Sequence, residues 1–131
     1  MIYTTESLRQ LGEVVRKASQ RNGRPLYVIS DEPYARIAYD GKHVPNIFPL
    51  IENSIIVTSH SKDLALPGER IGYLAANPRM TTVMQLMAGA VFCNRVLGFV
   101  KAPALMQRLL AKLQDESVDI AAYQSKREFL S

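Results

Sequence analysis

The stretch SIIVTSHSKDLALPGERIGYLAA, residues 54–76, decides the fold class of this chain. It begins with a run of apolar and β-branched residues, which is typical of a buried strand. A polar loop with a Pro-Gly turn follows, and a second apolar run ends the stretch. A similar apolar run lies upstream, so the sequence predicts strands over 26–30, 54–59 and 71–76.

Helical periodicity flanks these strands. The first helix is expected to begin at a Thr4 or Thr5 cap and to end at Asn22-Gly23, with apolar residues at helical spacing between them. After the third strand, Asn77-Pro78 is expected to be the cap and first turn of a second helix. Strands that are apolar on both faces need cover from helices on both sides of the sheet.

The last predicted helix opens at Pro103, and Asp115–Ser117 is expected to interrupt it. The order helix, strand, strand, strand, helix, helix predicts an α/β fold. We expect a partial three-layer sandwich, in which a three-strand portion of a mostly parallel sheet is flanked by helices. Since the strands lack a complete alternation with helices, the other strands of the sheet are expected in a missing part of the chain or in a partner.

Length and composition fit one domain or a piece of a larger one, with 131 residues of which 47% are hydrophobic and 21% charged. The net charge of +4 comes mainly from the first helix rather than from a basic stripe, which argues against nucleic-acid binding. No apolar run is long enough for a membrane span, and no signal peptide is apparent. With Cys93 as the single cysteine, we expect a cytoplasmic protein without disulfides or a metal centre.

Polar side chains gather at the ends of the predicted strands. Asp31 and Tyr34 follow the first strand, and Arg70 precedes the third. The second strand is followed by three more candidates, Ser59, Ser61 and Lys62. Taken singly, each has an ordinary structural reading as a turn former or a solvated charge. Together they indicate a site, because ligands of α/β sheets bind at the carboxyl ends of strands.

In this order and spacing the motifs resemble the core of class I/II aminotransferases, which are pyridoxal-phosphate enzymes of fold type I. The resemblance rests on three segments, SDEPY at 30–34, SHSK at 59–62 and PGERIGY at 67–73. It implies that residues 1–131 are part of the large, cofactor-binding domain. The final helix, about 103–131, would lead toward a small domain that is missing. The formal Ser-x-x-Lys signature of penicillin-interacting enzymes also fits 59–62, but none of its companion motifs follows.

The resemblance also implies a role for each candidate residue. Lys62 would form the Schiff base with pyridoxal 5'-phosphate, which requires a deprotonated amine. Asp31 would face the pyridine nitrogen and keep it protonated, which makes the ring a better electron sink. Tyr34 would donate to the ring oxygen. Ser59 and Arg70 would hold the phosphate, with Ser61 as an additional candidate, because a guanidinium makes two parallel bonds to phosphate oxygens.

The implied reaction is transfer of an amino group between an amino acid and a 2-oxo acid. Two alternatives stay open: a fold type I lyase, and a non-catalytic aminotransferase-like regulatory module. This chain alone is expected to be inactive, since the resemblance places other parts of the cofactor and substrate sites outside it. We also expect a homodimer. The segment 80–100 is apolar around most of its circumference, and contacts with the second subunit are expected to include Met84, Met87 and Val91.

Overall fold

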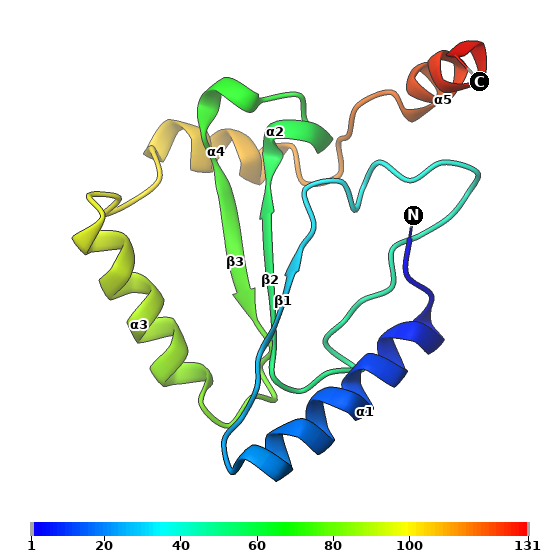
Figure 1. The fold of residues 1–131 in the computed structure, drawn as a ribbon. Helices are drawn as coiled ribbons and strands as arrows, with labels where there is room; N and C mark the ends of the chain where they lie inside the picture. Colours follow the sequence, from blue (N-terminus) through cyan, green and yellow to red (C-terminus); the bar gives the residue numbers. More distant parts are fainter. Residues whose placement is uncertain (1, 131) are drawn as a thin grey trace. The chain divides into compact units, whose positions relative to one another are not determined.

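The computed structural model describes residues 2–130 and contains a three-stranded sheet in the order β1-β2-β3 (Figure 1). β1 (Val28–Asp31) pairs in parallel with β2 (Ser54–Ser59). β3 (Gly72–Ala76) runs antiparallel to β2, because backbone hydrogen bonds join His60 N to Ile71 O at one end and Asn77 N to Ser54 O at the other. The α/β class is therefore confirmed, and the three strands form a mixed sheet.

The described residues divide into two compact units. The first unit contains the residues up to Asp31 together with Pro45–Val57 and Leu74–Lys101. The second unit contains Glu32–Val44, Thr58–Tyr73 and the described residues from Ala102 onward. The chain passes from one unit into the other within β2 and within β3, so each of these strands contributes to both units.

In the first unit, α1 (Thr5–Asn22) begins and ends as the sequence predicts. The Thr4 hydroxyl oxygen accepts a hydrogen bond from Ser7 N at 3.0 Å, which satisfies one of the free N–H groups of the first turn. Gly23 ends the helix in the left-handed conformation, with φ of 65°. Leu8 is the side chain of α1 that is buried.

The second helix of the first unit, α3 (Val83–Val96), begins later than predicted, and Asn77 does not cap it. The Asn77 side chain is instead buried, and its amide donates to Phe48 O at 2.8 Å and Ile51 O at 2.9 Å. The side-chain oxygen of Asn77, the atom that would cap a helix, accepts from Arg79 N at 3.1 Å, so Asn77 closes a turn that precedes α3. The buried apolar residues of this unit are Leu8, Ile47, Ile51, Ile55 and Met80.

α3 itself has no buried residue. Met84 is 77% exposed and Val91 51% exposed, while Met87 is half-buried. A helix this apolar requires cover. The structure holds one chain, so burial of these residues in a homodimer stays a prediction. No helix among residues 2–130 is long and apolar enough to cross a membrane.

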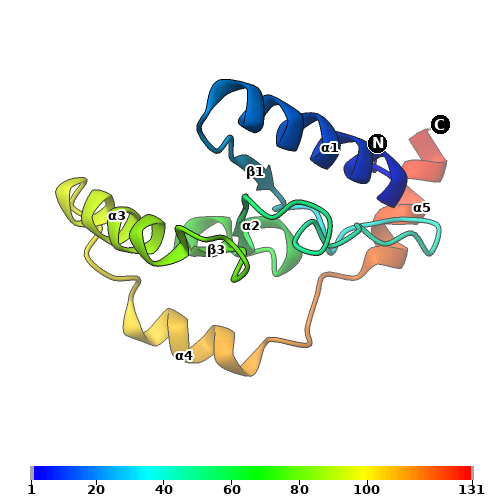
Figure 2. The same ribbon diagram turned by 90° about the horizontal axis from the view of Figure 1, so that it is seen from below.

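The second unit carries four short helical segments: α2 (His60–Asp63), the 3-10 turn η1 (Pro67–Glu69), α4 (Ala104–Lys112) and α5 (Ile120–Leu130). The predicted interruption near Asp115–Ser117 is confirmed, since an extended link separates α4 from α5 (Figure 2). α5 is held to the loop before β2 by Arg127. Its guanidinium makes two hydrogen bonds to the Asp40 carboxylate, at 2.9 and 3.1 Å, and lies 4.9 Å from the centre of the Tyr39 ring.

The hydrogen bonds from Arg127 hold the pKa of Asp40 below its usual value, although Asp40 is exposed. A carboxyl whose pKa is lower in the folded state stabilises that state above its unfolded pKa, and the contribution is lost as the pH falls through the folded pKa. Arg127→Gln is therefore expected to raise the Asp40 titration midpoint, measured by NMR. An unchanged midpoint in this variant would contradict the pairing.

Candidate active site

Lys62 and Tyr34, predicted from separate segments, come together in the second unit. Lys62 lies in the single turn of α2, immediately after β2, and its side chain is exposed. Its Nζ lies 5.7 Å from the centre of the Tyr34 ring. An ammonium group is attracted to the face of an aromatic ring at this distance. The contact therefore holds an amine and a phenol beside each other at the end of a strand.

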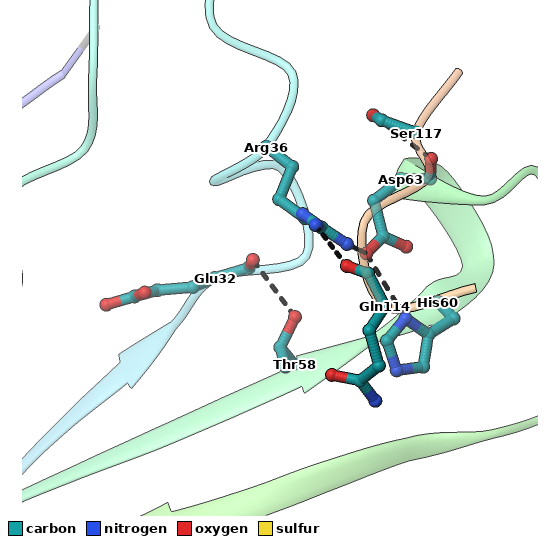
Figure 3. A network of polar contacts seen from close by, with 7 residues as sticks. All are labelled: Glu32, Arg36, Thr58, His60, Asp63, Gln114 and Ser117. Atoms are coloured by element: carbon teal, nitrogen blue, oxygen red, sulfur yellow. Dashed lines mark hydrogen bonds and ion pairs between the residues drawn. The ribbon is translucent and has the colours of Figure 1, made fainter. Parts of the chain in front are cut away.

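Tyr34 is carried by a tight turn after β1. Ala35 N donates to Glu32 O at 3.2 Å, and Ile37 N donates to Tyr34 O at 2.9 Å. The turn is fastened to the end of β2, because the Thr58 hydroxyl donates to Glu32 O at 3.0 Å (Figure 3). β2 thus positions both the lysine that follows it and the turn that presents the tyrosine.

Ser59 precedes α2, Ser61 lies within it, and Arg70 follows η1 just before β3. Ser59 is the last residue of β2 and precedes α2, but its half-buried hydroxyl makes no capping hydrogen bond to that helix. Arg70 adopts the left-handed conformation, with φ of 47°, and its guanidinium donates to Pro67 O at 2.9 Å. The bond from His60 N to Ile71 O brings the two backbone segments together. The two serines thus lie at and within the lysine turn, and Arg70 lies on the backbone segment that is bonded to its start.

Gly72 makes the close approach of these segments possible. A Cβ atom at this position would overlap the carbonyl oxygen of Thr58 and lie 2.8 Å from Ser59 Cα. Both neighbours are backbone atoms, so neither can move aside as a side chain would. The glycine therefore lets β3 lie directly against the part of β2 that leads into α2 and Lys62.

Asp31 ends β1 in the first unit, opposite Val57, and its side chain is exposed. The structure thus gathers Tyr34, Ser59, Ser61, Lys62 and Arg70 in one unit, while Asp31 belongs to the other.

Sequence analysis missed a buried cluster beside the lysine, formed by Asp63, His60 and Arg36 (Figure 3). Asp63 is 6% exposed, and its Oδ2 lies 3.1 Å from His60 Nδ1 and 3.8 Å from an Arg36 nitrogen. Since a carboxylate only accepts, the His60 ring N–H is the donor. The signal for this cluster in the sequence is weak, because an Asp next to a Lys is normally a solvent-exposed charge.

The sequence model of the family "Aminotransferase class I and II" matches residues 1–130. The chain belongs to this family. A crystal structure of an amino transferase from Eubacterium rectale superposes on 99% of the chain, with a TM-score of 0.96 and 38% identity. This chain covers 33% of that protein.

Other aminotransferases are similar to part or nearly all of the chain. An aspartate aminotransferase from Pyrococcus horikoshii is 38% identical over 58% of the chain, and one from Pinus pinaster is 31% identical over 98%. The chain spans 19% and 26% of the length of these two relatives. It therefore corresponds to a fragment of an aminotransferase of their size. A structure described as a PLP-dependent aminotransferase, from Streptococcus suis, matches with a TM-score of 0.57 and 29% identity over 93% of the chain.

The side chains of the second unit fit the cofactor that this family implies. Pyridoxal phosphate carries an aldehyde, a phenolic ring oxygen and a phosphate. The unit offers an exposed amine, a phenol beside it, two hydroxyls and a guanidinium on flanking segments. Arg70 uses one N–H group to donate to Pro67 O. A guanidinium has five N–H donors, so others are left that suit phosphate oxygens.

Proposed function

We propose that this chain supplies part of the pyridoxal-phosphate site of an aminotransferase, with Lys62 as its catalytic residue. The reaction is transfer of an amino group between an amino acid and a 2-oxo acid. The observation that carries the proposal is the Lys62 amine lying over the Tyr34 ring at the end of β2. Family membership over residues 1–130 supports the same reaction class.

When bound, the cofactor supplies an aldehyde that bonds to an amine and a ring that accepts electrons from the substrate α-carbon. Nζ of Lys62 would hold the cofactor until the substrate amine takes its place, and the freed, neutral amine would then accept the proton from the substrate α-carbon. The Tyr34 hydroxyl would donate to the ring oxygen, and Asp31 would keep the ring nitrogen protonated. Ser59, Arg70 and Ser61 hold the phosphate through their hydroxyl and guanidinium donors.

Arg70→Lys is expected to weaken binding of pyridoxine 5'-phosphate, a cofactor analogue without the aldehyde, by about tenfold or more. A lysine keeps the charge but loses the planar pair of donors, and hydrogen bonds to charged groups contribute about 1.5–3 kcal/mol. Titration calorimetry on the full-length protein measures the affinity. Arg108→Lys in the exposed α4 is the matched control. Equal affinities for all three proteins would remove Arg70 from the phosphate site.

An amino-transfer assay on the full-length protein tests the reaction class. L-Aspartate is the first donor to try, because several relatives are aspartate aminotransferases. We expect a 2-oxo acid product only when a second 2-oxo acid is added as acceptor. Product without acceptor would contradict transamination and favour the lyase alternative. Cofactor binding without turnover of any amino acid would favour a non-catalytic module.

The same proposal covers the organisation of the protein. Residues 1–131 would be part of the large domain, and the segment from about 103 would lead toward a small domain. A homodimer would cover the exposed apolar side chains of α3, such as Met84 and Val91. A cytoplasmic location remains a prediction from the sequence.

A further inference from the structure

We infer that Asp63 is a positioning residue. It holds Lys62 beside Tyr34 by linking the turn that carries the lysine to the turn that carries the tyrosine. This inference rests on the proposed function, since it concerns the reach of the Lys62 amine toward the cofactor. Asp63 directly follows Lys62 in α2 and is almost fully buried.

The burial of Asp63 is costly. Its Oδ2 has two partners, His60 and Arg36, but Oδ1 has no hydrogen-bond partner among residues 2–130. Moving a carboxylate out of water with one oxygen unsatisfied opposes folding. Replacing a buried charge pair by apolar residues is often neutral or stabilising. A contribution to folding stability is therefore a poor explanation for the buried Asp63 carboxylate, and its contacts indicate another role.

The first of those contacts fixes the lysine turn. α2 has only four residues, and a single helical turn is not stable without outside contacts. The Asp63 side chain bonds back to His60 at the start of the turn. The Asp63 carbonyl accepts from Val118 N at 2.8 Å and from the Ser117 hydroxyl at 3.4 Å. Asp63 thus ties the turn that carries Lys62 both to the start of that turn and to the link that follows α4.

The second contact reaches the tyrosine turn. Arg36 pairs with Asp63 and also donates to Gln114 O at 2.6 Å (Figure 3). It lies two residues after Tyr34, within the turn closed by the bond from Ile37 N to Tyr34 O. Holding the Arg36 guanidinium therefore restrains the backbone that presents the Tyr34 ring. Asp63 and Arg36 together link the two turns whose side chains meet at 5.7 Å.

The test separates cofactor affinity from covalent attachment in the full-length protein. Pyridoxine 5'-phosphate reports binding without the bond to lysine, and the absorbance change with pyridoxal 5'-phosphate reports the rate of attachment. Asp63→Asn and Arg36→Met are expected to slow attachment by about tenfold or more, because small displacements of reacting groups are costly. Their affinity for pyridoxine 5'-phosphate is expected to stay within about twofold of wild type, a change below 0.5 kcal/mol.

Asp40→Asn is the matched control, because Asp40 pairs with Arg127 in the same unit, away from Lys62 in sequence. It is expected to leave both quantities unchanged. Attachment at the wild-type rate in Asp63→Asn and Arg36→Met would overturn the inference, and so would a parallel loss of affinity and rate. If Asp63→Asn does not fold, the attachment rate of Arg36→Met tests the inference instead. The Arg36 side chain is 43% exposed, so its replacement is expected to leave the fold intact. A wild-type protein that does not attach the cofactor at Lys62 would overturn the proposed function as well.

Discussion

Lys62→Ala is expected to abolish covalent attachment of pyridoxal 5'-phosphate and to lower the amino-transfer rate by at least about 10²–10⁴-fold. This range is the usual loss when a positioned proton-transfer group is removed, and the loss of the bond to the cofactor adds to it. Lys62 is exposed, so the substitution leaves no cavity and no buried group without a partner. Absorbance of the bound cofactor and a coupled assay for the 2-oxo acid product measure the two effects.

Lys126→Ala provides a matched control for this variant. The Lys126 ammonium lies 5.4 Å from the centre of the Tyr123 ring in α5, a contact of the same type as that between Lys62 and Tyr34. Its removal tests whether any lysine stacked on a tyrosine matters. We expect normal attachment and transfer rates in this variant. Equal loss in both variants, or full activity in Lys62→Ala, would contradict the role assigned to Lys62.

Gly72→Ala is expected to destabilise the folded protein by about 1–3 kcal/mol or more, the range for overpacking of a close contact. The added Cβ overlaps the Thr58 carbonyl oxygen, and relief requires β3 to move away from β2. The movement would displace the segment that connects Ser59 to Lys62. Urea denaturation of the full-length protein measures the midpoint, and loss of cofactor attachment should accompany the loss of stability.

Gly68→Ala is the control, because it adds the same methyl group in the same connection. A Cβ at Gly68 has no heavy atom within 4 Å, and its backbone is not in the left-handed region. Its urea midpoint should stay close to that of the wild type, as for other surface substitutions. Equal midpoints for Gly72→Ala and the wild type would show that β2 and β3 are not packed as closely as described.

Local signals in the sequence predicted the elements whose boundaries depend on nearby residues. The Thr4 cap and the Gly23 stop define α1 through contacts three residues apart, and both appear in the structure. The strand over 54–59 was predicted with its observed bounds, Ser54–Ser59, since a run of β-branched residues marks it clearly. The motifs around Lys62 and Arg70 carried the family, which the comparisons confirm.

The errors concern residues whose partners are distant in sequence. Asn77 has the local signature of a helix cap, but its side-chain oxygen closes a turn with Arg79 N before α3 begins, and its amide donates to the distant carbonyl groups of Phe48 and Ile51. Asp63 has one local partner, His60, but its contacts with Arg36 and with the link after α4 are distant in sequence and no local pattern reveals them. The antiparallel direction of β3 was likewise not predicted, because it depends on the return path through residues 60–71. Each of these features depends on contacts between segments that are distant in sequence.

The role proposed for Lys62, as the residue that bonds to the cofactor, can be measured directly. The most direct measurement is borohydride reduction of the full-length protein with pyridoxal 5'-phosphate, followed by peptide mapping by mass spectrometry. We predict one dominant label, on the peptide that contains Lys62. A dominant label on any other lysine, such as Lys42 or Lys126, would contradict the site described above.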